Sequence, residues 1–204
     1  MNYEAKNYDH LLGTEGFSDQ LLKNHFTLYQ GYVTNTNKIA GLLEQFLKEG
    51  KETTPEYAEL KRRFGWEFNG MRFHQYYFGN MKKGGVALNS NSDLANKIAT
   101  DFGSIEMWQK DFKATGTMRG IGWVVLEYHP CANRLFNVWI NEHDGGHLAG
   151  TTPILVMDVF EHAFMIDYGL KRADYIVSFL KAIDLSKAEK RFDLVKASQP
   201  SCAR

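Results

Sequence analysis

The chain lacks a surplus of charge of either sign, and it has few cysteines. Its 204 residues include 24 Lys and Arg against 24 Asp and Glu. A nucleic acid or an anionic membrane would favour a basic surplus, so this balance argues against both as partners. The two cysteines, Cys131 and Cys202, lie far apart and form no Cys-x-x-Cys motif. We therefore expect no structural disulfide and a location in the reducing cytoplasm.

The sequence also lacks a long apolar run. No stretch reaches the length of a transmembrane helix, and the polar first residues lack the apolar core of a signal peptide. There is no internal repeat and no low-complexity tract. Length and apolar content therefore predict a soluble globular protein with a sizeable core and no membrane partner.

Apolar residues with helical spacing fill the first part of the chain. They predict two long helices, one over residues 18–48, with a bend near Gly31 or just after it, and one over residues 55–81. Two consecutive glycines then mark a domain boundary at 84–85. We therefore predict an N-terminal antiparallel helical hairpin domain over residues 1–84.

The rest of the chain alternates between shorter patterns. Helices are expected at 92–100, 104–113, 160–168 and 173–182, and strands at 120–127, 135–140 and 152–157. Helices around a small three-stranded antiparallel sheet give an α+β fold, so residues 85–204 form the predicted C-terminal domain. The polar end, from residue 187 onward, is expected to fray.

The run Asp158-Val159-Phe160-Glu161-His162 is the most informative motif. In a helix, Asp158 and His162 lie one turn apart on one face and can bind one metal ion. Apolar neighbours make a charged Asp158 costly, and a bound cation would compensate it. A plain Asp–His hydrogen bond, or an Asp favoured by a helix N-terminus, explains the pair without a metal.

Two further histidines lie among aromatic residues in the expected helices. His25 precedes Tyr32 by two helical turns, and His74 lies in the run Phe-His-Gln-Tyr-Tyr-Phe. With Asp158 and His162 they offer three imidazoles and one carboxylate. This set suits Fe, Mn, Zn or Co rather than Ca or Mg. It fits a zinc hydrolase, a non-haem iron oxygenase or a redox metal site.

Several motifs in the same order resemble the iron/manganese superoxide dismutases over most of residues 15–185. The strongest match is DVFEHAF (158–164), which is similar to the family's DVWEHAYY. The other matches are YVTN (32–35), FHQYYF (73–78), GIGW (120–123) and RADY (172–175). The resemblance implies an enzyme that converts superoxide to oxygen and hydrogen peroxide, working as a homodimer or homotetramer.

The resemblance also implies the metal ligands: His25, His74, Asp158 and His162. They would hold one Fe or Mn ion per subunit, with a water or hydroxide as fifth ligand. The ion would cycle between trivalent and divalent states, and these ligands suit Fe and Mn alike. The alternative is a non-catalytic relative that keeps the metal site for a structural role.

The first of these ligands depends on a one-residue deletion. The family usually has its ligand eight residues before the tyrosine of the Tyr-Val-Thr-Asn run, where this chain has Asn24. His25 lies seven residues before Tyr32, which is two turns of a regular helix. We therefore assign His25, and we expect a regular helix where relatives have a bulge.

Three more residues match positions around the metal. By resemblance, Tyr32 would lie at the approach of the substrate and help to supply protons, and Trp123 would pack beside the metal and keep it dry. Glu161 would reach across a dimer interface to His162 of the other subunit and orient that imidazole. Each match thus carries an expected role in catalysis or assembly.

His143 stands where the family often places a glutamine, in the segment before the third strand. The family's other glutamine position corresponds to Gly70. An imidazole N–H can donate a hydrogen bond as an amide does, but an imidazole also titrates. We expect His143 to take the place of the glutamine in catalysis; the alternative is a solvent-exposed loop residue.

The approach to the site departs from the family pattern. Many members pair a histidine of the first helix with a tyrosine of the partner chain. This chain has Leu28 or Tyr29 at the first position and Phe164-Met165 at the second. The basic residue usual near this approach is also absent. Attraction of the superoxide anion must therefore come from other Lys or Arg residues.

Overall fold

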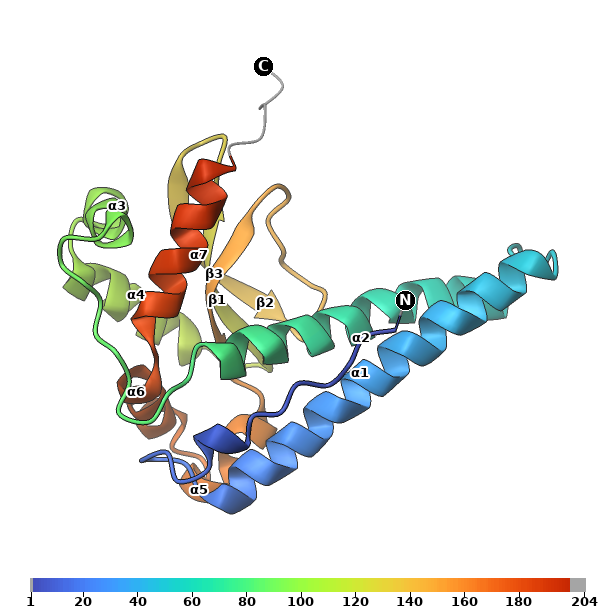
Figure 1. Cartoon of the computed structure of the whole chain (residues 1–204), viewed down its shortest axis with the longest axis horizontal. Helices are drawn as coiled ribbons and strands as arrows, with labels where there is room; N and C mark the ends of the chain where they lie inside the picture. The colour runs from blue at the N-terminus through green and yellow to red at the C-terminus, as the bar shows by residue number, and fades with distance from the viewer. Residues whose placement is uncertain (1, 199–204) are drawn as a thin grey trace.

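The structure, a computed structural model, describes residues 2–198 and has the predicted α+β architecture (Figure 1). The helices are α1 (Asp19–Lys48), α2 (Pro55–Gly79), α3 (Asp93–Phe102), α4 (Ile105–Gly116), α5 (Met165–Tyr168), α6 (Arg172–Ala182) and α7 (Leu185–Ala197), with short 3-10 turns η1 (Asp9–Leu11) and η2 (Glu161–Ala163). The strands are β1 (Gly122–His129), β2 (Arg134–Asn141) and β3 (Thr152–Asp158).

The two long helices form the predicted antiparallel hairpin, in which α1 and α2 lie together near the turn that joins them and diverge toward their other ends (Figure 1). Ser18 caps α1 by accepting a hydrogen bond from the Leu21 N–H, and Thr54 caps α2 in the same way ahead of Pro55. The expected bend near Gly31 does not break the helix, because α1 is helical without interruption over Asp19–Lys48. The hairpin therefore presents two long regular faces.

The sheet has the order β2-β1-β3, with β1 antiparallel to both neighbours. Trp123 in β1 lies opposite Ile140 on one side and Asp158 on the other. Gly122 has a φ of +149°, and an added Cβ would lie 2.0 Å from the Ile140 carbonyl oxygen, so only glycine fits there. Helices α4 and α7 pack against the sheet.

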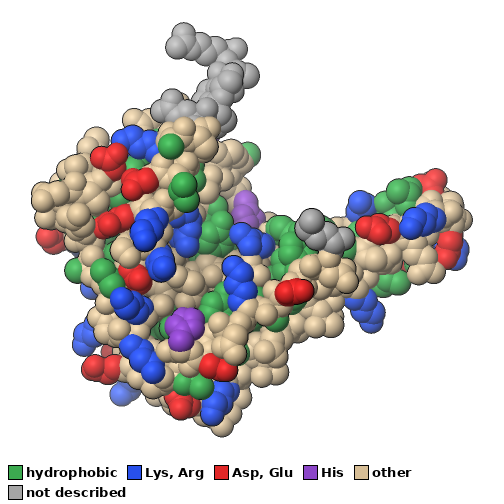
Figure 2. All heavy atoms as spheres, in the orientation of Figure 1, with side chains coloured by type: hydrophobic (Ala, Val, Ile, Leu, Met, Phe, Trp, Pro, Cys, Tyr) green, Lys and Arg blue, Asp and Glu red, His purple; other side chains and the backbone are tan. Residues whose placement is uncertain are grey.

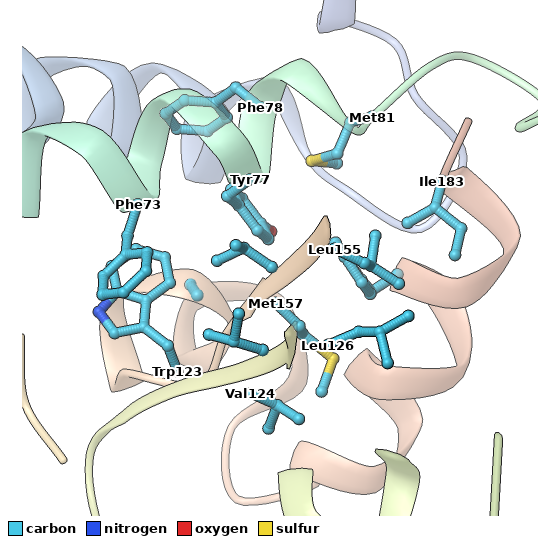
Figure 3. Close-up of a cluster of buried hydrophobic side chains, with 14 of the residues drawn as sticks. Phe73, Tyr77, Phe78, Met81, Trp123, Val124, Leu126, Leu155, Met157 and Ile183 are labelled. Carbon is cyan, nitrogen blue, oxygen red and sulfur yellow. The ribbon is translucent and has the colours of Figure 1, made fainter. Parts of the chain in front are cut away.

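One apolar core joins the hairpin to the sheet (Figure 3). Its labelled side chains come from α2 and the residues just after it, from β1 and β3, and from the segment after α6: Phe73, Tyr77, Phe78, Met81, Trp123, Val124, Leu126, Leu155, Met157 and Ile183. An isolated antiparallel β-bridge also pairs Met81 with Ile183, and these two residues lie on either side of residues 84–85 in the chain. The division into domains 1–84 and 85–204 stays a prediction.

The predicted helix over residues 160–168 is wrong. Asp158 is the last residue of β3, and only a 3-10 turn and the four-residue α5 follow it. The Asp158 carboxylate accepts the Phe160 N–H at 2.8 Å, and Phe160 itself is extended (φ −67°, ψ 155°). This local hydrogen bond turns the chain out of the sheet before a helix can form.

The expectation of a frayed end from residue 187 is also wrong up to residue 198. The segment forms α7, whose buried face consists of Leu185, Ala188 and Phe192. Arg191 donates hydrogen bonds to the Ile154 carbonyl and to the Asn80 side chain, which fastens the helix to the core. A sparse apolar stripe is enough to dock a mostly polar helix. The remainder of the expected tail, 199–204, lies outside the described residues.

The expectation about disulfides is corrected as well. Cys131 is disulfide-bonded, and Cys202, the chain's other cysteine, lies outside the described residues. Cysteine content therefore gives no support to a reducing compartment, and the cytoplasmic location stays a prediction. Within residues 2–198, no helix combines the length and the apolar character needed to cross a membrane.

Candidate metal centre

Four side chains from different elements meet where the hairpin joins the sheet. His25 comes from α1, His74 from α2, Asp158 from the end of β3 and His162 from η2, and their ligand atoms all lie within 4.8 Å of one another. Asp158 Oδ2 lies 3.2 Å from Nε2 of His25, 3.1 Å from Nε2 of His162 and 3.7 Å from Nε2 of His74. Such separations are those of atoms that can share one ion.

The helices present their histidines through simple periodicity. In α1, buried residues recur every four positions at Leu21, His25, Tyr29 and Val33. Asn24, the competing candidate, is exposed and accepts a hydrogen bond from Gln20 on the helix surface. The structure therefore brings His25, and not Asn24, into the cluster. It does so with the regular helix predicted from the sequence.

The environment of His74 determines which of its nitrogens is free. Its Nδ1 lies 2.6 Å from the Gly70 carbonyl oxygen, which can only accept a hydrogen bond. Nδ1 therefore carries the proton, and the lone pair is on Nε2. That buried Nε2 has no hydrogen-bond partner among the described residues, and it faces Asp158. A buried lone pair without a donor fits a metal ligand.

The charge of the cluster also suits a cation. Burial acts to raise the pKa of Asp158, but the interactions of the carboxylate with His162 and His25 outweigh it and hold that pKa well below its usual range. Burial lowers the pKa of His25 and of His74, so both are neutral. A buried carboxylate beside the neutral imidazoles of His25 and His74 needs a positive charge, and these residues fit Fe or Mn.

A second hydrogen-bonded group adjoins the cluster. Trp123 donates its indole N–H to Nδ1 of His143 at 3.0 Å, and Nε2 of His143 lies 2.7 Å from the Tyr32 hydroxyl. The indole can only donate, so Nδ1 is the acceptor and Nε2 carries the proton. His143 is fully buried, which excludes the exposed-loop alternative. Both of its nitrogens are occupied by protein groups.

Tyr32 lies between this group and the histidine cluster. Its ring stacks on His74 with centroids 5.2 Å apart, and burial raises its pKa, so the hydroxyl stays protonated. The ring rests against Gly70, where an added Cβ would lie 2.6 Å from a Tyr32 ring carbon. A glutamine at position 70 would displace Tyr32. The absence of a side chain at Gly70 is thus a packing requirement.

Aromatic rings wall the cluster on several sides. Trp123 meets His74 edge-on at 5.0 Å, and Phe78 lies 4.8 Å from His25. Phe160 stacks on His162 at 5.1 Å. These rings keep water away from the ligand atoms and strengthen the electrostatic interactions among them.

Two supporting residues were not foreseen from the sequence. Tyr175 donates its hydroxyl to the Asp158 carbonyl oxygen at 2.6 Å and is fully buried, so it fixes the backbone of a cluster residue. Tyr175 is the last residue of the Arg-Ala-Asp-Tyr motif, so that motif is the sequence feature that could have indicated it. Trp66 meets His143 edge-on at 4.9 Å. No motif pointed to Trp66.

Glu161 is the one predicted site residue outside this constellation. It is exposed, and its side chain forms no hydrogen bond with the described residues. Its neighbour His162 has 27% of its side chain exposed, whereas the other three cluster residues are fully buried. The cluster is therefore open toward solvent on the side of His162.

Comparison with known proteins supports the same family that the motifs indicated. The family model described as iron/manganese superoxide dismutases, C-terminal domain, matches residues 90–191. A superoxide dismutase [Fe] of Cupriavidus metallidurans is 36% identical over 182 residues, which is 87% of this chain and 89% of the relative. A superoxide dismutase [Mn] of Haloarcula marismortui is 33% identical over 91% of this chain and 90% of that relative.

A third relative, a superoxide dismutase [Fe] of Aquifex pyrophilus, is 33% identical over 91% of this chain and 89% of its own length. Relatives named for iron and relatives named for manganese thus match almost the whole chain. The chain belongs to the iron/manganese superoxide dismutase family.

Proposed function

We propose that this protein dismutates superoxide at one Fe or Mn ion per subunit, held by His25, His74, Asp158 and His162. The observation that carries the proposal is the buried, unpartnered Nε2 of His74 facing a carboxylate that two other imidazoles share. Family membership supports the reaction, and the donor set supports the choice of metals.

The reaction consumes two superoxide anions and two protons and yields oxygen and hydrogen peroxide. A metal held by these four residues would supply the redox chemistry by which one superoxide is oxidised and the other reduced. The protein holds the ligands in place before the ion binds. Gly70 fixes the tautomer of His74, and Tyr175 fixes the backbone of Asp158.

Tyr32 is the group best placed to deliver protons. Its hydroxyl oxygen accepts the Nε2–H of His143, so its own proton is free to point toward the site. Burial lowers the pKa of His143 to about 4, so the imidazole is neutral near pH 7 and keeps that single N–H. Trp123 holds His143 in this tautomer. His143 therefore acts through Tyr32, as a positioning residue.

We propose that two copies associate through the face that contains His162. Beside Glu161 and His162, this face exposes Met165 (44%), Ile166 (52%) and Leu170 (92%). Clustered apolar side chains of this size favour burial against a partner. Glu161 would then reach His162 of a second copy and fix its orientation. A homodimer through this face, or a homotetramer built from two such dimers, is the expected assembly.

The test is superoxide decay catalysed by the purified protein after separate loading with Fe and with Mn. Activity with either metal supports the proposal and identifies the working cofactor. A protein that binds one equivalent of each metal and accelerates decay with neither would overturn it. Inductively coupled plasma mass spectrometry gives the metal content per chain.

A further inference from the structure

A surface pocket of about 200 Å³ opens between α1 and α2. Its lining residues are Leu28, Gly31, Tyr32, Asn35, Arg63 and Glu67. Tyr32 connects it to the metal centre, because the Tyr32 ring stacks on His74. The pocket is large enough for a small anion, and it ends at the residue that carries the catalytic proton.

One cation and one carboxylate line this pocket, and they differ in exposure. Arg63 has 45% of its side chain exposed, whereas Glu67 has 3%. The guanidinium Nε donates to Oε1 of Glu67 at 2.8 Å, and Nη2 lies 2.7 Å from the same oxygen in an ion pair. Among the described residues, nothing hydrogen-bonds to Nη1 of Arg63. The pocket therefore presents a positive donor group to solvent, with the compensating carboxylate behind it.

One aromatic neighbour and one polar neighbour hold the Arg63–Glu67 pair in place. The Arg63 guanidinium lies 5.3 Å from the centre of the Trp66 ring, and Trp66 in turn meets His143 edge-on. Asn35 donates to the second oxygen of Glu67 at 3.4 Å. The position of Arg63 is thus tied to the group that orients Tyr32. A fixed cation recognises an anion better than a freely moving one.

The chain as a whole gives an anion no long-range attraction, because its formal net charge is zero. The face presented in Figure 2 carries Lys and Arg as well as Asp and Glu. Attraction toward the site therefore requires a local positive group near the substrate's path. Arg63 is the one cation among the residues that line the pocket beside Tyr32.

We propose that Arg63 attracts superoxide, and other small monovalent anions, into the pocket beside Tyr32, and that Glu67 weakens this attraction by neutralising part of its charge. This proposal rests on the proposed function for its substrate. Its anion-binding part does not depend on dismutation. It assigns the attraction to a residue of the second helix in a chain that lacks the family's usual basic residue.

Three isosteric or matched variants of the metal-loaded protein test it. Arg63→Gln should lower kcat/KM for superoxide about threefold at low ionic strength, and Glu67→Gln should raise it about twofold, because the exposed guanidinium is then uncompensated. Both differences should shrink as salt is added. Arg62→Gln is the control: it removes the same charge from an exposed neighbour that pairs with Glu59, and it should change nothing.

The opposite signs separate an electrostatic role from a structural one. If the Arg63–Glu67 pair only supported the helix, both substitutions would lower activity, and salt would not alter the difference. That result, or an Arg63→Gln variant equal to Arg62→Gln, would overturn the proposal. The dissociation constant of azide, followed in the visible spectrum of the metal-loaded protein, gives an independent readout. It should rise in Arg63→Gln and fall in Glu67→Gln.

The azide measurement also distinguishes this proposal from the proposed function. If the protein has no dismutase activity but its azide affinity follows the predicted order, the anion site is supported and the proposed enzymatic function is not. An active protein whose azide affinity ignores both substitutions would retain the enzyme and lose the anion site. The two outcomes lead to different conclusions.

A second test fills the pocket without removing charge. Gly31 lines the pocket within α1, and an added Cβ would meet nothing within 4 Å. Gly31→Leu should therefore fold normally, raise Tm through better helix propensity and lower kcat/KM severalfold by obstructing the pocket. Gly41, also exposed in α1 with open space around it, is the control, since Gly41→Leu should raise Tm alone. Equal activity of both variants would place the anion's path elsewhere.

Discussion

The Trp123 indole and the Tyr32 hydroxyl bind opposite nitrogens of one buried imidazole, at 3.0 and 2.7 Å. Because the indole only donates, this arrangement fixes the tautomer of His143 and leaves it a single N–H, which goes to Tyr32. A glutamine amide has two N–H groups and an oxygen, so it could serve both neighbours and still donate once more. His143 has no such spare donor.

His143→Gln should therefore keep activity, because the amide can accept from Trp123 and donate to Tyr32. Its second N–H is expected to shift the metal preference or the pH profile. His143→Leu should lose activity and about 2 kcal/mol of stability, because it leaves the buried Trp123 N–H without an acceptor. Superoxide decay with each metal and urea unfolding measure these effects. A His143→Gln variant indistinguishable from the parent would remove His143 from the mechanism.

Stability should fall with acid more steeply in the parent than in His143→Gln. Burial lowers the pKa of His143 to about 4 in the folded protein, whereas an unfolded histidine titrates near pH 6.5. The unfolded state then binds more protons between these values, so the free energy of unfolding falls as the pH drops from about 6.5 to 4, by roughly 3 kcal/mol in total. Urea unfolding of both proteins across this range measures the difference. If the free energy of unfolding depended on pH in the same way in both proteins, the lowered pKa of His143 would be contradicted.

Gly70→Ala should destabilise the protein by about 2 kcal/mol, because the new methyl group would lie 2.6 Å from a Tyr32 ring carbon. The displaced tyrosine should also lower activity. Gly65→Ala is the matched control in α2, where an added Cβ meets nothing within 4 Å, and it should stabilise the helix by roughly 0.5–1 kcal/mol. Thermal unfolding and superoxide decay together would reveal whether Tyr32 tolerates the methyl group.

Tyr175→Phe should lower the affinity for the metal and cost about 1–3 kcal/mol of stability, since it leaves the buried Asp158 carbonyl without its donor. Tyr168→Phe removes a comparable hydroxyl bond, which goes to the Gly16 carbonyl and not to a residue of the cluster, and it should retain the metal. Chelator competition measures the affinities. Equal metal loss in both variants would mean that Tyr175 has no specific effect on Asp158.

His25→Ala should abolish metal binding, whereas Asn24→Ala should retain a full complement, because Asn24 lies exposed on the helix surface. Metal content after dialysis against a weak chelator is the measurement. Loss of metal in Asn24→Ala together with retention in His25→Ala would reverse the assignment of the first ligand.

The sequence predicts most of the fold because its strongest signals are local. The spacing of Leu21, His25 and Tyr29 places His25 inside the hairpin, and helix geometry alone decides against Asn24. Asp158 and His162 could be paired, but not assigned to a strand and a 3-10 turn, because a separation of four residues also fits a helix. The hydrogen bond from the Phe160 N–H to the Asp158 carboxylate, which accompanies the end of the strand, cannot be read from this spacing.

The arrangement around Arg63 cannot be predicted from the sequence, for a different reason. Arg63, Trp66 and Glu67 form no motif, and their meaning comes from contacts with Tyr32 and His143, which lie in other parts of the chain. Likewise, α7 reads as a polar tail until its three apolar residues meet the core. The sequence pattern indicates the candidate ligands, whereas the charge and packing around them appear only in three dimensions.

The four proposed metal ligands come from two helices and from the end of a strand with the turn that follows it, which are distant from one another along the chain. An ion held by all of them is therefore a cross-link that closes two long loops of the polypeptide. It can bind only after the hairpin has docked on the sheet, so metal occupancy reports complete folding. Chains that acquire the ion should open more slowly and resist proteolysis longer than chains that do not.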